Sequence, residues 1–272
     1  MIRALFFDLD GTLLSSGKKL LPSTVSALQS CRERGVRVYL ATARSPRLDR
    51  TLGWTEAEFA LFDGGLYCNG ACIVHGTEQR YLYIDPDAAR ACIRQVARHP
   101  GIQMSLHMEG DLHAFNHHLP DHMLGPWGVT RGDILPLDEH ALRHAVKILI
   151  YTDCLVGSTR PLPQELFPAL QVSCGDGANL YLTDGGCTIQ VASREASKHL
   201  AIEGVGRQLG LRPEEIAVFG DDLNDVEMLS HCPNSVAMGN AHPEVKAIAA
   251  HVTLSCDDDG VAHALKNILH LI

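Results

Sequence analysis

Residues 2–14 read IRALFFDLDGTLL, and this stretch sets the expectation for the whole fold. Its first six residues are mostly apolar, which is typical of a strand buried on both faces of a sheet. Two carboxylates, Asp8 and Asp10, follow this strand directly, and Gly11 permits a tight turn that keeps both near one point. One carboxylate could attack a phosphorus atom while the other protonates the leaving oxygen. The simpler alternative is a strand end followed by an Asx turn.

The flanking sequence predicts a parallel sheet. Ser23–Arg34 has helical spacing and ends before Gly35, and Val36–Ala41 has the composition of a second strand. A strand, a helix and a strand in this order make a βαβ unit. The alternation returns near the other end, with an expected helix at Glu195–Leu209 and an expected strand at Ile216–Phe219.

These patterns indicate an α/β protein with an insertion. Residues 1–83 and 192–272 are expected to form a discontinuous core, a Rossmann-like doubly wound parallel sheet. Residues 84–191 are expected to form an inserted α+β cap domain. Within it we expect helices at Ala88–His99, Asp138–His144 and Pro161–Pro168, a Pro-, Gly- and His-rich loop at Asn116–Pro136, and strands at Ile102–His107, Leu112–Phe115, Val146–Tyr151, Leu170–Ser173, Asn179–Leu182 and Thr188–Val191.

The composition excludes several classes of partner. The 272 residues are 46% hydrophobic and 20% charged, with a formal net charge of -9. No basic stripe for nucleic acid and no apolar stretch of membrane-spanning length is found, so neither partner is expected. The nine cysteines are scattered and odd in number, which favours reduced thiols and a cytoplasmic location. Nothing in the sequence indicates an oligomeric state.

Two further stretches supply groups for an anionic ligand. Thr42, Ala43 and Arg44 follow the second strand, where a hydroxyl and backbone amides can meet phosphoryl oxygens at a helix start. Lys198 could reach both a phosphoryl oxygen and a nucleophilic carboxylate. Alone, the first stretch reads equally well as a helix N-cap, and a single helical lysine is usually solvated.

A final stretch predicts a metal site. Residues 220–225 read GDDLND directly after an expected strand. Their carboxylate and amide oxygens are hard ligands suited to Mg²⁺. The alternative is an acidic helix start. Phosphoryl transfer requires a nucleophile, a metal, a proton donor and positive groups on the phosphoryl oxygens, and the four stretches together offer each of these.

In this order the four stretches resemble the motifs of the haloacid dehalogenase (HAD) superfamily. FDLDGTLL at residues 7–14 resembles its first motif and GDDLNDVEML at residues 220–229 its fourth. Three shorter stretches, NGA at 69–71, AMGNA at 237–241 and DGVA at 259–262, resemble the Cof-type branch with a class IIB cap. The resemblance implies a phosphatase whose cap is inserted between the second and third motifs.

The resemblance also implies a role for each matching residue. Asp8 would be the nucleophile, which becomes an aspartyl-phosphate, and Asp10 the general acid and base. The phosphoryl group would contact Thr42, Ala43, Lys198 and Asn224, and Mg²⁺ would be held by Asp8, the backbone carbonyl of Asp10, Asp221 and Asp225. Two positions depart from the usual pattern, because Ala43 and His199 stand where the family commonly has glycine.

Substrate-contacting residues are harder to predict. Arg44 could touch the substrate or cap a helix, and Asn69 lies in a matching motif. His113, His118 and Trp127 are expected in or beside loops of the insert, where they can meet a polar metabolite. The histidines at 113, 117, 118 and 122 match no standard metal spacing, so we favour a solvated or substrate-facing loop. We also expect the loop Asn116–Pro136 to govern selectivity among substrates.

Together these observations predict a magnesium-dependent hydrolase of a small phosphomonoester, such as a sugar phosphate or a phosphorylated cofactor. One alternative is a phosphomutase acting on a hexose phosphate, which would share the aspartyl-phosphate step. The other is a non-catalytic binding module, which would not need both a nucleophile and an acid.

Overall fold

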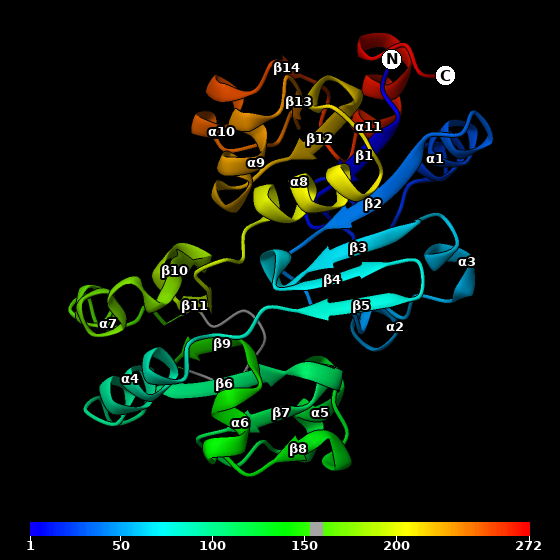
Figure 1. Cartoon of the computed structure of the whole chain (residues 1–272). Coiled ribbons are helices and arrows are strands. Elements are labelled where there is room, and N and C mark those ends of the chain that lie inside the picture. Colours follow the sequence, from blue (N-terminus) through cyan, green and yellow to red (C-terminus); the bar gives the residue numbers. More distant parts are fainter. Residues whose placement is uncertain (153–159) are drawn as a thin grey trace. The chain divides into compact units, whose positions relative to one another are not determined.

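The computed structural model describes residues 1–152 and 160–272, which form two compact units. Unit 1 comprises Met1–Arg44, Trp54–Arg80 and Ser197–Ile272, and unit 2 comprises Ser45–Gly53 and Tyr81–Ala196 (Figure 1). The second part of unit 2 begins three residues before the expected insert and ends five residues after it. Ser45–Gly53, which was expected in the core, has its main contacts with unit 2.

Unit 1 is built on an eight-stranded sheet in the order β14-β13-β12-β1-β2-β3-β4-β5. The pairs from β14 to β3 are parallel, and β3 and β4 are antiparallel. The strands are β1 (Ala4–Phe7), β2 (Arg37–Ala41), β3 (Gly64–Tyr67), β4 (Cys72–His75), β5 (Glu78–Tyr81), β12 (Ile216–Gly220), β13 (Asn234–Ala237) and β14 (His251–Val252).

The position of β1 creates the site. All four of its residues are buried, and it pairs with β2 on one side and β12 on the other. The chain runs outward from β1 through β2 and β3, and later outward on the other side through β12 and β13. This reversal of strand order is the topological switch point at which open α/β sheets bind ligands, beyond the carboxyl ends of the strands.

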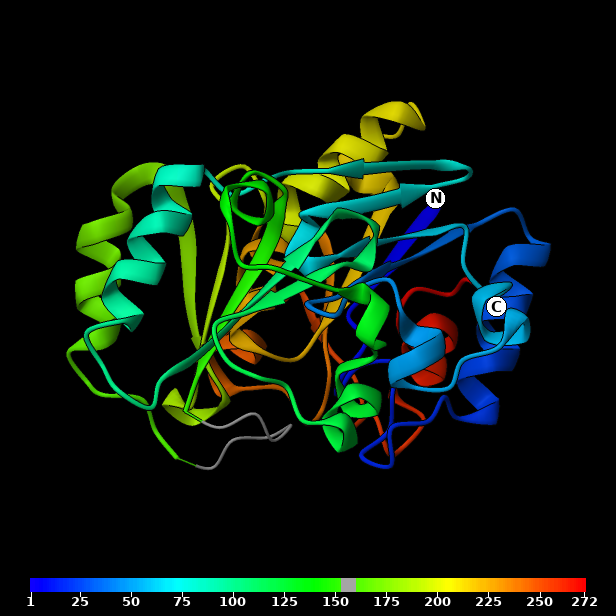
Figure 2. The ribbon, with the colours of Figure 1, turned by 90° about the horizontal axis from the view of Figure 1, so that it is seen from below.

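Short helices flank this sheet in two groups. In one group α1 packs with α11, and in the other α9 packs with both α8 and α10. Figure 2 shows α8 (yellow) and α1 (blue) in separate parts of the unit. The helices of unit 1 are α1 (Pro22–Glu33), α3 (Glu56–Phe59), α8 (Lys198–Gln208), α9 (Val226–His231), α10 (Pro243–Ile248) and α11 (Gly260–His263).

Unit 2 contains a six-stranded sheet in the order β10-β11-β9-β6-β7-β8, antiparallel except between β7 and β8. One face carries α4, α6 and α7, whose apolar side chains share a core with the sheet. A smaller apolar cluster joins α5 to β7. The elements are β6 (Gln103–Met108), β7 (His113–Phe115), β8 (Ile134–Leu135), β9 (Ala145–Tyr151), β10 (Ala178–Thr183), β11 (Thr188–Ser193), α2 (Leu48–Thr51), α4 (Pro86–Val96), α5 (Asp121–Trp127), α6 (Glu139–Arg143) and α7 (Leu166–Cys174).

Two expected elements of the insert are wrong. Leu170–Ser173, expected as a strand, lies inside helix α7, which begins later than the helix expected at Pro161–Pro168. Leu166, Leu170 and Cys174 are buried at a spacing of four, the helical period, which a short apolar run does not reveal. The expected loop Asn116–Pro136 contains α5 and β8, because Met123 and its apolar neighbours pack despite the internal Pro126.

Within residues 1–152 and 160–272, no helix is long and apolar enough to cross a membrane. None of the eight cysteines that the structure describes forms a disulfide bond, and seven of them are buried. Cys154, the ninth, lies outside the described residues.

Candidate active site

A buried lysine joins two carboxylates at the switch point. The Nζ atom of Lys198 lies 2.6 Å from Oδ1 of Asp8 and 2.6 Å from Oδ1 of Asp225. Lys198 is the first residue of α8, and the preceding Ser197 caps this helix by accepting from the Leu200 N–H. Burial lowers the pKa of Lys198, but Asp225 and Asp8 outweigh burial and raise it, so the side chain is a cation.

Three carboxylates surround this lysine. Asp8, Asp221 and Asp225 each offer one oxygen, and these oxygens lie within 4.8 Å of one another. Burial raises the pKa of Asp8 well above its usual value; Lys198 opposes this effect, while the charges of Asp225 and Asp221 add to it. Burial also raises the pKa of Asp221 to about 7, against a hydrogen bond from Thr12. Burial, with the neighbouring carboxylates adding to it, therefore opposes the charged forms of Asp8 and Asp221.

The loop after β12 is held closed by Asp225. Its Oδ2 atom accepts hydrogen bonds from the backbone N–H of Asp221 at 2.9 Å and of Asp222 at 3.1 Å. A Cβ atom at Gly220 would lie 2.6 Å from the Asp225 side chain, so the glycine is required for this closure. Because both Asp225 oxygens already accept hydrogen bonds, Asp225 positions Lys198 and the loop. Its predicted role as a metal ligand stays a prediction.

The turn after β1 fits against the same loop. Gly11 has a φ of 82°, and a Cβ there would lie 2.2 Å from Oδ2 of Asp221. Thr12 donates from Oγ1 to Oδ1 of Asp221 at 2.8 Å. The DGT sequence therefore brings the backbone of residues 10–12 against Asp221, which only glycine permits at position 11.

Asp10 forms ion pairs with two basic side chains, those of Arg44 and Lys18. Arg44 approaches it in a two-pronged contact, with Nε 2.5 Å from Oδ2 and Nη2 2.9 Å from Oδ1, and Lys18 lies 2.8 Å from Oδ1. Burial raises the pKa of Asp10, but the hydrogen bonds and charges of Arg44 and Lys18 outweigh burial and lower it. In this arrangement Asp10 is a carboxylate. A proton-donor role requires Arg44 to release it.

The remaining predicted residues of unit 1 lie on neighbouring loops. Thr42 is buried directly after β2, and its Oγ1 accepts from the Arg44 N–H at 3.1 Å. Half-buried Ala43 separates the two. Asn69 adopts a left-handed φ of 56°, and its Oδ1 accepts from Nδ2 of Asn224 at 3.3 Å. Asn69 was predicted only through its motif, and its contact with Asn224 links that motif to the GDDLND loop.

The predicted site residues of unit 2 differ in exposure and in their place in the fold. His118 is exposed in a loop, as expected. His113 is only 3% exposed and is the first residue of β7, inside the strand expected at Leu112–Phe115, so it is less accessible to a ligand than His118. Trp127 ends α5 and packs against Phe115 and Tyr151, with ring centroids 5.3 Å and 5.4 Å apart.

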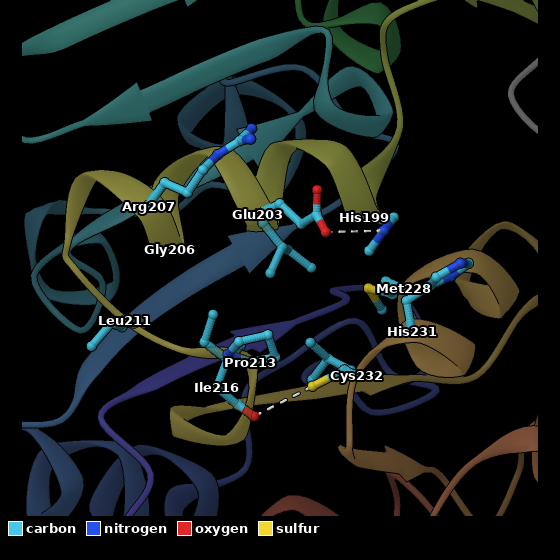
Figure 3. Close-up of a pocket in the computed structure, with 12 residues that line it drawn as sticks. His199, Glu203, Gly206, Arg207, Leu211, Pro213, Ile216, Met228, His231 and Cys232 are labelled. Carbon is cyan, nitrogen blue, oxygen red and sulfur yellow. Dashed lines mark hydrogen bonds and ion pairs between the residues drawn. The ribbon is translucent and has the colours of Figure 1, made fainter.

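A separate cavity of about 170 Å³ lies beside α8 and α9 (Figure 3). Among the residues that the structure describes, those lining this cavity include none of the predicted site residues. His199, which does line it, directly follows Lys198 in the sequence. The rings of His199 and His231 stack there with centroids 4.2 Å apart. The chemistry-bearing carboxylates therefore lie elsewhere in unit 1.

A small divalent cation fits the acidic cluster. Asp8 and Asp221 offer oxygen atoms, and burial together with the neighbouring carboxylates raises the pKa of both groups, an effect that a bound cation would oppose. Oxygen donors of this kind suit Mg²⁺. A buried carboxylate joined to a lysine, beside an acidic cluster at the switch point of a parallel sheet, matches the groups that phosphoryl-transfer enzymes of α/β fold require.

The comparisons with known proteins identify the family. Residues 5–265 match the family of haloacid dehalogenase-like hydrolases, so the chain belongs to that family. An HMP-PP phosphatase from Klebsiella pneumoniae is 29% identical, with 99% of this chain and 96% of that protein aligned. Phosphatase YwpJ from Bacillus subtilis is 46% identical over 80 residues, which are 29% of this chain and 28% of that protein.

Solved structures agree with the fold. A HAD-superfamily phosphatase from Bacteroides thetaiotaomicron has a TM-score of 0.80 and 23% identity, covering 100% of this chain and 96% of that one. A HAD subclass IIB sugar phosphatase has a TM-score of 0.79 and 24% identity, covering 99% and 100%. The predicted superfamily, the Rossmann-like α/β fold and the prediction of an HAD hydrolase are therefore confirmed.

Proposed function

We propose that this chain is a Mg²⁺-dependent phosphatase that hydrolyses a small phosphomonoester through an aspartyl-phosphate on Asp8. The observation that supports this most is the Asp8–Lys198–Asp225 contact beside Asp221. A binding module would not need Asp8 to be buried and paired with Lys198, a lysine at a helix start 190 residues away in the sequence.

In the first step an Asp8 oxygen attacks phosphorus, and the bond from phosphorus to the leaving oxygen breaks. Asp10, once protonated, gives its proton to that oxygen. In the second step water attacks phosphorus, Asp10 takes the proton of the water, and the bond to Asp8 breaks. Lys198 offsets negative charge throughout, and Thr42 offers a hydroxyl to the phosphoryl oxygens.

Mg²⁺, when bound, would neutralise charge on the phosphoryl oxygens. Asp8, the Asp10 carbonyl and Asp221 would hold it. The names of relatives support small phosphorylated substrates, because one is an HMP-PP phosphatase and another is a sugar phosphatase. The decisive experiment is a phosphate-release screen over sugar phosphates and phosphorylated cofactors with Mg²⁺ present. Product analysis with a hexose 1-phosphate would separate hydrolysis from a phosphomutase reaction.

We expect activity to be lost in EDTA and restored by Mg²⁺. Without metal, Asp8 and Asp221 would meet an anionic substrate while Lys198 opposes only part of the effect of burial and of the neighbouring carboxylates. Phosphate release from p-nitrophenyl phosphate is the measurement. A Ca²⁺-only or K⁺-only buffer is the control, and full turnover in metal-free buffer would disprove the proposed requirement.

The same metal site should couple stability to pH. The folded-state pKa of Asp221 is raised to about 7, above its usual value. The contribution of protonated Asp221 to the free energy of unfolding is therefore present at low pH and is lost as the pH rises through 7. Metal-free protein should therefore lose thermal stability between about pH 5 and pH 8. Mg²⁺ competes with that proton, so the melting-temperature increase on adding Mg²⁺ should be larger at the higher pH. An equal increase at both values would contradict this account.

Replacing Asp10 by Asn should slow turnover in a way that depends on the leaving group. Asn cannot donate the proton, so alkyl phosphates should lose about 10²–10⁴-fold in kcat/KM. p-Nitrophenyl phosphate has a leaving group of low pKa that needs little protonation, and its loss should be smaller. The ratio of the two losses is the measurement, and equal losses would rule out Asp10 as the proton donor.

Residues 84–191 are proposed as the cap that recognises the leaving group, since the matched motifs all lie outside them. Asn116–Pro136 remains the candidate selectivity segment. Its ordered α5 and its packed Trp127 make it a more structured surface than the loop predicted from sequence. Single replacements of His118 and Trp127 by Ala are expected to change specificity constants unequally across substrates.

A further inference from the structure

Two cysteines from distant parts of the chain meet in the core of unit 2. Cys92 lies in α4, Cys174 is the last residue of α7, and both belong to the apolar core that these helices share with the sheet. Their Sγ atoms lie 3.7 Å apart, although 82 positions separate them in the sequence. Figures 1 and 2 both show α4 and α7 side by side. The sulfur contact therefore joins two helices that cover the same face of the sheet.

Neighbouring contacts hold the two helices close at this point. Nε2 of Gln95 in α4 donates to Oγ of Ser173 in α7 at 2.5 Å. A Cβ atom at Gly177, just after α7, would lie 3.2 Å from the Cβ of Ala88. Ala88 precedes Cys92 by about one helical turn, so small residues on both segments permit this close approach. The packing of α4 against α7 therefore keeps the two sulfurs in contact.

The two thiols have different surroundings. Cys92 is fully buried, whereas Cys174 is 7% exposed. Sγ of Cys174 donates to the backbone oxygen of Ala88 at 3.7 Å, so Cys92 is the donor in the contact between the sulfurs. This hydrogen bond lowers the pKa of Cys174, an effect that burial opposes and the charge of Arg94 adds to. The same hydrogen bond, together with burial, raises the pKa of Cys92. Because the thiolate is the reactive form, Cys174 is the more reactive of the two.

A role in packing alone explains less of this arrangement. Buried cysteine often acts only as a small apolar side chain. Such a role accounts for the burial of each residue, but it does not require two sulfurs from different helices at hydrogen-bond distance. It also does not account for a pair in which the more accessible thiol is the one with the lowered pKa. A thiol of this kind beside a second thiol is typical of cysteines that oxidise to a disulfide.

We propose that Cys92 and Cys174 form a reversible disulfide bond when hydrogen peroxide oxidises this chain. In the first step the Cys174 thiolate attacks an oxygen of the peroxide, the O–O bond breaks, and Cys174 becomes a sulfenic acid while one water is released. In the second step the Cys92 sulfur attacks the Cys174 sulfur, the S–O bond breaks, and the Cys92 proton leaves with the hydroxide as a second water. The two thiols lose two electrons and the peroxide gains them. The proposal concerns unit 2 alone and does not rest on the phosphatase activity.

The bond would tie α4 to α7 and close a long loop of chain. A disulfide stabilises a protein chiefly by restricting its unfolded state, and the restriction grows with the number of residues enclosed. Here 82 positions separate the two cysteines. Oxidised protein should therefore melt about 5 °C or more above reduced protein. Unit 2 is thus reinforced under oxidising conditions, and a dithiol that reduces the bond reverses the change.

The test is to map the bond in the full chain. Native protein is treated with stoichiometric hydrogen peroxide, the remaining thiols are alkylated in denaturant, and the digested product is analysed by mass spectrometry. The number of alkylated cysteines should fall by two from the nine of the sequence, with Cys92 and Cys174 in one cross-linked species. Dithiothreitol should restore both thiols and return the melting temperature to its initial value.

Variants assign the two roles. Cys92→Ser has no second thiol at this point, so dimedone, which traps sulfenic acids, should label Cys174. In Cys174→Ser, fully buried Cys92 should stay unlabelled. Neither variant should gain melting temperature on oxidation. Cys187, a buried cysteine of the same unit, supplies the matched control, because Cys187→Ser should keep both the cross-link and the gain. Cys92→Ala replaces Cys92→Ser if the latter does not fold.

The outcomes decide each part of the proposal. Retention of all nine thiols, or a bond between other cysteines, would overturn it. A mapped bond without a gain in melting temperature would overturn the stabilising role, and dimedone on Cys92 instead of Cys174 would overturn the assigned order of attack. All of these results are read on the protein itself, so they stand whether or not any phosphate ester is hydrolysed.

Discussion

An Asp8→Asn variant is expected to release no measurable phosphate while remaining folded. The amide keeps the size of the side chain but removes the nucleophilic oxygen. Loss of a nucleophile that acts together with its partner groups costs ~10⁴-fold or more. Phosphate release over several hours, with the melting temperature read in parallel, measures both parts of this expectation.

The stability expectation follows from the surroundings of Asp8. Burial raises the pKa of this carboxyl, which shows that its charge is costly where it stands. Lys198 keeps Asp225 as a partner at 2.6 Å in the variant, so no unpaired cation is created. The melting temperature should therefore be no lower than that of the wild type.

A matched control and a trapping experiment complete this test. Asp258 is an exposed aspartate of the same unit, and Asp258→Asn should keep full activity. Acid quenching of wild type during turnover should give one phosphate per chain on Asp8. Finding that phosphate on any other residue would contradict the assignment, whatever the activity of the variant.

The core could be predicted well because each of its elements is encoded locally. The apolar run of β1 ends at Asp8, and the GDDLND loop follows β12, so strand-end position alone brings the two acids to one edge. The contact of Lys198 with both Asp8 and Asp225 depended on packing across 190 residues of chain. The sequence analysis suggested that Lys198 could reach the nucleophilic carboxylate, but it did not predict the contact with Asp225.

The insert was less predictable for two physical reasons. The apolar stretch in α7 has too few residues to distinguish a strand from a helix. Helix α5 contains Gly125 and Pro126, which favour a loop locally, yet it is held by tertiary packing around Met123. The network of Asp10 with Arg44 and Lys18 was also missed, because a bidentate ion pair leaves no spacing pattern in the sequence.

A Lys198→Met variant is expected to lose both activity and stability. The side chain is buried, and removing one member of a buried ion pair costs about 3–5 kcal/mol because the partner charge is left uncompensated. Loss of one charge-stabilising group should also reduce turnover by about 10²–10³-fold. Exposed Lys19 provides the control, since Lys19→Met should change neither property by much.

The pH dependence of the stability of Lys198→Met tests whether the lost ion pair causes its stability deficit. In wild type, Lys198 opposes the rise in the pKa of Asp8, so its removal raises that folded-state pKa further. A raised carboxyl pKa gives stability that is present at low pH and is lost as pH increases. Measured in EDTA, the stability deficit of Lys198→Met should therefore be larger near pH 8 than near pH 5, in keeping with this linkage.

A double variant separates lost charge balance from lost packing. Asp8→Asn in the Lys198→Met background removes one of the two carboxylates left uncompensated, and should recover part of the melting temperature although activity stays absent. Asp258→Asn in the same background should recover nothing. If the double variant melts no higher than Lys198→Met alone, the deficit comes from the cavity and not from the charges. The ion-pair account of this site would then be wrong, because coupled charges give non-additive effects.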